Sequence, residues 1–139
     1  MSYETQITVA FNDIDAAGIV YFANVFDYCH QAYEHLLEAI SLPLSHILNE
    51  EQWAMPLVHA EADYMAPMRH GERITIQIRL RKVGRSAMHF GYELYGPNGN
   101  LRARVLLVHA AVETTGFRPQ AVNTEFVDAL SKIGLNPEE

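Results

Sequence analysis

The sequence has only one cysteine, Cys29, among its 139 residues. A lone cysteine cannot form a disulfide within the chain, and low cysteine usage suits a reducing compartment. We therefore expect a cytoplasmic protein in which Cys29 packs in the core. The sequence also lacks any short Cys/His cluster with the spacing of a structural zinc site. We expect no metal and no prosthetic group.

Long apolar runs are absent as well. No stretch approaches the roughly 18 apolar residues that a membrane-spanning helix needs. The start of the chain, residues 1–5, lacks the basic residues and apolar core of a signal peptide. These absences predict a protein with neither a membrane span nor a secretion signal.

Basic residues are scarce, with 10 Lys and Arg against 17 Asp and Glu, so the formal net charge is −7. This balance argues against nucleic acid as the main partner. Six of the ten basic residues nevertheless fall in residues 69–85. They form either a solvated strand face and turn or a local phosphate-binding patch, since the arginine fork donates two hydrogen bonds at once.

Hydrophobic periodicity predicts an α+β fold. Residues 3–11 alternate between apolar and polar side chains, as in a half-buried strand. Apolar residues then recur every three or four positions over 22–40, which predicts a helix of about five turns with Asn24 as a possible N-cap. A long helix with a broad apolar stripe needs cover, and an antiparallel sheet curled around it would supply that cover.

The remaining elements follow from similar patterns. A short helix is expected after Pro43, and Asn98-Gly99 marks a hairpin turn. The further expected strands are 55–66, 72–83, 86–96 and 101–115, and a short helix is expected near 124–133. The length of the chain predicts one domain over residues 1–139, with a core of about 3–115 and a C-terminal tail helix.

The most informative segment, residues 13–22, reads DIDAAGIVYF and lies between the first strand and the long helix. Free N–H groups and the partial positive charge of a helix start suit a developing oxyanion. A carboxylate beside them can act as a base or as a nucleophile. The segment thus points to acyl transfer or hydrolysis, while Asp13 could instead cap the loop through backbone N–H groups.

This motif and the order of elements resemble the 4-hydroxybenzoyl-CoA thioesterase family, which has the hot-dog fold. The resemblance covers about residues 3–115, including the segments Met55–Val58 and Asp63–Pro67. Within the family, the sequence is most similar to the 1,4-dihydroxy-2-naphthoyl-CoA thioesterases of phylloquinone and menaquinone synthesis. Three segments carry that likeness: Val20–Asn24, Cys29–Glu34 and Pro56–Ala60.

The resemblance implies roles for residues of the motif. It makes Asp15 the catalytic residue, which attacks the thioester or activates a water, and makes the Phe22 N–H the oxyanion donor. Gly18 would allow close approach of the loop to the substrate. Tyr21 and His59 are candidates for the substrate pocket. Further residues could line a pocket for a flat aromatic acyl group or could simply be core: Phe26, Trp53, Met55 and Tyr64.

The resemblance also implies a site for coenzyme A at the turn of residues 81–86. Family members commonly hold the phosphates there, often from the neighbouring subunit, and this turn would supply Lys82, Arg85 and Ser86. Hot-dog domains usually pair, so we expect a homodimer or a homotetramer.

Taken together, the resemblance implies an acyl-CoA thioesterase that hydrolyses 1,4-dihydroxy-2-naphthoyl-CoA. One alternative is a thioesterase for another acyl group, of 4-hydroxybenzoyl or fatty type. The other is a hot-dog module that binds acyl-CoA without cleaving it, since a fold alone does not define a function.

Overall fold

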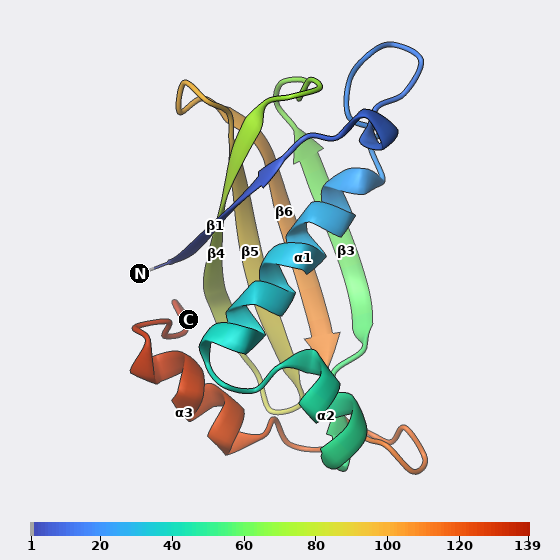
Figure 1. Ribbon diagram of the computed structural model, residues 1–139. Coiled ribbons are helices and arrows are strands. Elements are labelled where there is room, and N and C mark those ends of the chain that lie inside the picture. Colours follow the sequence, from blue (N-terminus) through green and yellow to red (C-terminus); the bar gives the residue numbers. More distant parts are fainter. Residues whose placement is uncertain (1) are drawn as a thin grey trace.

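The computed structural model describes residues 2–139. The strands are β1 (Tyr3–Thr8), β2 (Trp53–Ala54), β3 (Leu57–Tyr64), β4 (Arg73–Val83), β5 (Ala87–Tyr95), β6 (Leu101–Ala110) and β7 (Val112–Glu113). The helices are α1 (Asn24–Ala39), α2 (Leu44–Glu50) and α3 (Thr124–Lys132), with a 3₁₀ turn at Phe11–Asp13. Figure 1 shows their arrangement.

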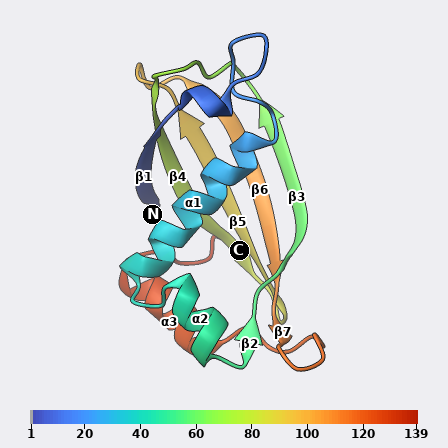
Figure 2. The ribbon, with the colours of Figure 1, turned by 45° about the vertical axis from the view of Figure 1, so that its right-hand side comes forward.

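Five strands form one antiparallel sheet in the order β1-β4-β5-β6-β3, and α1 lies diagonally across its face (Figure 1). The loop before α1 lies at one end of the sheet, whereas α2 and α3 lie at the other end (Figure 2). The predicted α+β fold, a sheet wrapped around one long helix, is confirmed. No helix among residues 2–139 is both long and apolar enough to cross a membrane.

The apolar stripe of α1 faces the sheet as its spacing predicted. Fully buried members recur every three or four residues at Val25, Cys29, Ala32 and Leu36, and Leu37 beside the last of them is buried too. Asn24, however, is the first helical residue rather than the N-cap, a position that Ala23 occupies. The Asn24 side chain donates a hydrogen bond to the Asp13 carbonyl oxygen at 2.9 Å, so it anchors the preceding loop instead.

The strands of the sheet show the expected alternation. In β4, four inward residues are at most 1% exposed: Ile74, Ile76, Ile78 and Leu80. The alternation predicted over residues 3–11 extends beyond the end of the first strand, β1. Phe11 was expected on the face of Ile7 but is 78% exposed, because β1 ends at Thr8 and the chain turns into the 3₁₀ segment.

The expected strand 101–115 is interrupted after Ala110. The segment β7 leaves the main sheet and pairs with β2, which forms a separate two-stranded sheet. Trp53 of β2 is buried and stacks on Phe126 of α3 at 5.8 Å between ring centroids. This contact joins the tail helix α3 to the small β2–β7 sheet.

Strand β3 is an edge of the main sheet and pairs only with β6. Almost all of its residues are exposed, including the apolar side chains of Leu57 and Val58. An uncovered edge presents a row of unpaired N–H and C=O groups to any chain that can add a strand. Strand β3 is therefore available to pair with a strand from another chain.

Candidate active site

The loop of residues 13–22 is a tight hairpin that is held by backbone hydrogen bonds. The Asp15 N–H donates to the Ile19 carbonyl oxygen at 2.8 Å, and the Gly18 N–H donates to the Asp15 carbonyl oxygen at 3.0 Å. Gly18 adopts φ +82°, a conformation that glycine reaches without strain. A side chain there would meet no atom within 4 Å, so the backbone conformation alone calls for glycine.

The Asp15 carboxylate is oriented through one of its two oxygens. Its Oδ1 accepts hydrogen bonds from the Ala17 N–H at 2.8 Å and, more weakly, from the Ile19 N–H at 3.5 Å. Among residues 2–139, no hydrogen bond engages Oδ2. One oxygen therefore holds the side chain in place, while the other remains available for a proton or a carbonyl carbon.

Asp13 has a structural position. Its Oδ2 accepts hydrogen bonds from the Tyr28 hydroxyl at 2.7 Å and from the Ala10 N–H at 3.2 Å. Burial and the neighbouring carboxylate raise the pKa of Tyr28, which keeps its hydroxyl protonated as the donor. Asp13 thus caps the loop and ties it to α1, as the capping interpretation of this residue proposed.

The start of α1 leaves donors free beside Asp15. The Asn24 N–H donates to the Tyr21 carbonyl oxygen at 2.9 Å, which closes the first turn. Within the part of the chain that the structure describes, the backbone N–H groups of Phe22 and Ala23 donate no hydrogen bond. Free donors at a helix start can stabilise an oxyanion.

A hollow of about 460 Å³ joins the carboxylate to this helix start. Asp15, Tyr21 and Phe22 line it on one side, and residues 64–68 line the other. The Tyr64 hydroxyl donates to the Phe22 carbonyl oxygen at 2.8 Å, so the two walls are directly connected. A carboxylate, free N–H donors and an apolar wall together can support acyl transfer.

The far wall of this hollow is anchored by an ion pair that the sequence patterns did not reveal. Arg102 of β6 donates to both Glu72 oxygens at 2.8 Å and to the Pro67 carbonyl oxygen at 2.6 Å. These bonds to Arg102, together with the Arg69 N–H, which donates to Glu72 Oε1 at 2.6 Å, lower the pKa of Glu72 to about 2. The Met65 and Ala66 N–H groups both donate to the Arg102 carbonyl oxygen, so Arg102 positions the whole wall.

The structure does not bring His59 to this hollow. His59 lies opposite Val108, on the face of the sheet that points away from α1, and it hydrogen-bonds to Glu61 at 2.9 Å. Its side chain is 53% exposed. Within one chain, His59 and Asp15 therefore lie on different faces.

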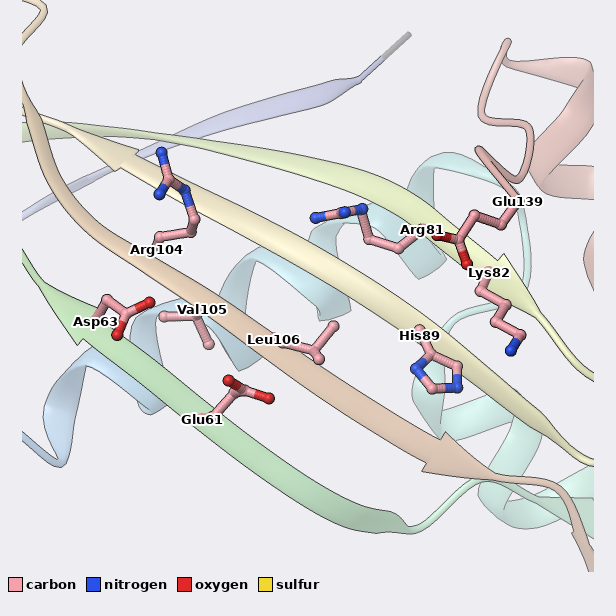
Figure 3. Close-up of a pocket in the computed structure, with 9 residues that line it drawn as sticks. All are labelled: Glu61, Asp63, Arg81, Lys82, His89, Arg104, Val105, Leu106 and Glu139. Carbon is pink, nitrogen blue, oxygen red and sulfur yellow. The ribbon is translucent and has the colours of Figure 1, made fainter.

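The predicted coenzyme A residues also lie away from Asp15 within one chain. Lys82 lies near the end of β4, and Arg85 and Ser86 lie in the β4–β5 connection, at the opposite end of the sheet from the 13–22 loop (Figure 1). Lys82 lines a hollow of about 400 Å³ on the outer face, next to Arg81 and Glu139 (Figure 3). The Arg85 and Ser86 carbonyl oxygens accept hydrogen bonds from backbone N–H groups at 2.8 Å.

The aromatic residues that were expected to line a pocket divide between two places. Tyr21 and Tyr64 line the Asp15 hollow, whereas Trp53 and Met55 line a second hollow at the other end of β3. Phe26 packs against the core. The second hollow also contains His109, a buried side chain that the strand pattern of the sequence did not distinguish from its neighbours.

Comparison with known proteins gives a consistent result. A sequence model of the thioesterase-like superfamily matches residues 9–130. A 1,4-dihydroxy-2-naphthoyl-CoA hydrolase from Nostoc punctiforme is 35% identical over 130 residues, which are 94% of this chain and 87% of that protein. The same enzyme from Gloeothece citriformis is 31% identical over 95% of this chain and 94% of its own length.

A solved structure shows the same likeness in three dimensions. The crystal structure of a 1,4-dihydroxy-2-naphthoyl-CoA thioesterase from Synechocystis superposes with a TM-score of 0.89 and 26% sequence identity. The superposition covers 96% of this chain and 98% of that one. The sheet, the central helix and the site loop are therefore shared over nearly the full length.

Proposed function

This chain belongs to the thioesterase-like superfamily, and from that premise we propose that it hydrolyses 1,4-dihydroxy-2-naphthoyl-CoA to the free acid and CoA. This reaction is a step of phylloquinone and menaquinone synthesis. One observation carries the proposal: the Asp15 carboxylate, with one oxygen free, shares a hollow with the unpaired N–H groups at the start of α1.

In the proposed reaction, the thioester carbonyl oxygen accepts a hydrogen bond from the Phe22 N–H. The free oxygen of Asp15 either removes a proton from an attacking water or attacks the carbonyl carbon itself. In the first case, hydroxide adds to the carbon, the C–S bond breaks and the sulfur of CoA takes up the proton. In the second, the C–S bond breaks and the CoA thiolate leaves as the acyl-aspartate forms. Water then hydrolyses the acyl-aspartate and supplies the proton for the thiolate, so the products are the same.

The edge strand β3 supports a homodimer as part of this proposal. Two copies that pair antiparallel along β3 would extend the sheet across a two-fold axis and cover its exposed edge. Such pairing would bring the β4–β5 connection of one subunit toward Asp15 of the partner subunit. Lys82, Arg85 and Ser86 are therefore proposed to bind the phosphates of CoA held by the partner's site.

The experiment is thiol release from 1,4-dihydroxy-2-naphthoyl-CoA, a benzoyl-type CoA and palmitoyl-CoA by the wild type, Asp15→Asn and Asp128→Asn. Asp128 is an exposed aspartate on α3, away from β3 and from Lys82, and provides the matched control. We expect preference for the naphthoyl ester and a loss of about 100- to 10,000-fold in kcat for Asp15→Asn alone. Equal activity of Asp15→Asn would refute the mechanism.

The other outcomes are also decisive. Preferred cleavage of another ester would keep the thioesterase but replace its substrate. Binding of acyl-CoA without thiol release would favour a non-catalytic module. The cytoplasmic location and the assignment of residues 1–139 to one domain stay predictions.

A further inference from the structure

The second hollow, of about 280 Å³, lies between α1, α2 and the start of β3. Its wall is mostly apolar, with contributions from Leu44, Ile47 and Trp53, and two histidines, His30 and His109, also line it. Three apolar side chains at the hollow are strongly exposed: Leu48 at 68%, Phe117 at 62% and Leu57 at 45%. Exposed apolar groups gathered around a concave surface are typical of a binding site.

One polar atom stands out in this apolar setting. His109 of β6 is 1% exposed, and its Nδ1 lies 2.8 Å from the Met55 carbonyl oxygen. A carbonyl can only accept, so Nδ1 carries the proton and Nε2 is a hydrogen-bond acceptor. Among residues 2–139, Nε2 is buried and has no partner.

The packing of the ring keeps this acceptor in place. His109 stacks on Tyr33 at 4.6 Å and meets Phe90 edge-on at 5.8 Å between ring centroids. Burial lowers the pKa of His109, so the imidazole stays neutral at physiological pH. A buried acceptor without a donor is costly in an isolated protein, which favours a ligand that brings the missing donor.

The position of the hollow determines whether a ring bound in it can reach Asp15 of the same chain or Asp15 of the partner subunit. It adjoins Leu57 at one end of β3, whereas the Asp15 hollow adjoins Tyr64 at the other end. The two ends lie roughly 23 Å apart along an extended strand. A ring attached directly to a thioester carbonyl cannot cover that distance within one chain. Antiparallel pairing along β3 would instead place the Leu57 end of one subunit beside the Tyr64 end of its partner.

We propose that this hollow receives the acyl ring of the substrate attacked by Asp15 of the partner subunit, and that His109 Nε2 accepts a hydrogen bond from a ring hydroxyl. The inference rests on the proposed thioesterase function and deepens it. The substrate class is a flat aromatic acyl-CoA with a hydroxyl donor, and His109 is a residue that determines specificity.

The first test compares kcat/KM for 1,4-dihydroxy-2-naphthoyl-CoA, its dimethyl ether and unsubstituted 2-naphthoyl-CoA. The wild type is expected to prefer the hydroxylated ester about tenfold over both analogues, the effect of one hydrogen bond. His109→Phe should lose this preference, so that its kcat/KM values for the hydroxylated ester and for 2-naphthoyl-CoA become equal within the same variant. His35→Phe, on the exposed side of α1, is the matched control and should keep the preference.

The wild-type comparison remains valid if His109→Phe does not fold. Equal kcat/KM values for hydroxylated and unsubstituted esters would overturn the inference and leave the thioesterase intact. Loss of activity with the bulkier ether alone would reveal a steric effect and would also overturn it. Failure to cleave any of the three esters would instead refute the proposed function.

The second test locates the hollow relative to Asp15. A heterodimer of one Asp15→Asn subunit and one His109→Phe subunit, purified through two different tags, has a single intact Asp15. If the ring enters the partner subunit, that Asp15 uses a wild-type His109, and the tenfold preference persists. A preference as low as that of the His109→Phe homodimer would show that the ring stays within one chain, and would refute the arrangement.

Discussion

Replacing Glu72 by Gln should loosen the wall that faces Asp15 in the candidate active-site hollow. Arg102 donates to both Glu72 oxygens at 2.8 Å, and its side chain is only 9% exposed. Glutamine keeps the shape of Glu72 but removes the charge and one acceptor. The Arg102 guanidinium is then left in a poorly solvated position without a counter-charge.

The size of the effect follows from the pKa of Glu72. A fall from 4.5 to about 2 corresponds to an upper bound of roughly 3–4 kcal/mol of folding free energy at neutral pH. The Glu72 side chain is 23% exposed, so solvent screens part of this interaction. We expect Glu72→Gln to lower the free energy of unfolding by about 2 kcal/mol, or Tm by roughly 6–8 °C.

Urea denaturation at a fixed protein concentration measures the change, and a surface pair provides the control. Glu138 pairs with Arg81 at 2.8 Å, with side chains 39% and 52% exposed. Glu138→Gln should cost less than about 1 kcal/mol, as exposed ion pairs do. Glu72→Gln should also lower kcat/KM, since Arg102 positions residues 65–67. Equal stability losses in the two variants would refute the reasoning.

The Glu72–Arg102 pair also predicts how the folding stability depends on pH. The pKa of Glu72 is lower in the folded protein, so its contribution is fully present above pH 4.5 and is lost as the pH falls toward about 2. The stability difference between the wild type and Glu72→Gln should therefore be largest near pH 7 and vanish near pH 2. A difference that stays constant over this range would contradict the assignment of the stabilisation to the ionised carboxylate.

Two further substitutions test the loop and the edge strand. Gly18→Ala should cost about 1–2 kcal/mol of stability, because Gly18 has a φ of +82°, and should also reduce kcat by displacing Asp15. Gly99→Ala, at φ +79° in the β5–β6 turn, is the control and should cost similar stability with kcat unchanged. Val58→Asp, at an exposed position of β3, should yield monomers by light scattering and lose activity. Ile133→Asp, at the exposed residue just after α3, should leave the dimer intact. A dimeric and fully active Val58→Asp would exclude β3 as the interface.

Local patterns were sufficient for much of the fold. The three-to-four spacing of apolar residues in α1 and the alternation in β4 each reflect the geometry of a single element. Such patterns do not report where pairing stops. The expected strand 101–115 therefore gave no sign that β7 would leave the sheet for β2, and the alternation of residues 3–11 concealed the turn at Phe11.

The same holds for the candidate site: the residues that are contiguous in the chain could be predicted, and the partners distant in sequence could not. The motif of residues 13–22 predicted a carboxylate beside a helix start, because strand, loop and helix are contiguous in the chain. The partners that hold the opposite wall, Glu72 and Arg102, are 30 positions apart and could not be paired from spacing. His109 likewise looked like any other strand residue until Met55 and Tyr33 were found around it.

The sequence by itself determined the class of fold, the loop of residues 13–22 and the glycine at its turn, since these depend on backbone geometry within a few residues. Only the tertiary structure decided that His59 lies on the far face of the sheet, that the expected pocket residues line two hollows, and that one hollow contains an unpaired acceptor. Those properties depend on strand register and on the order of strands in the sheet, which bring distant segments together through contacts that no local periodicity encodes.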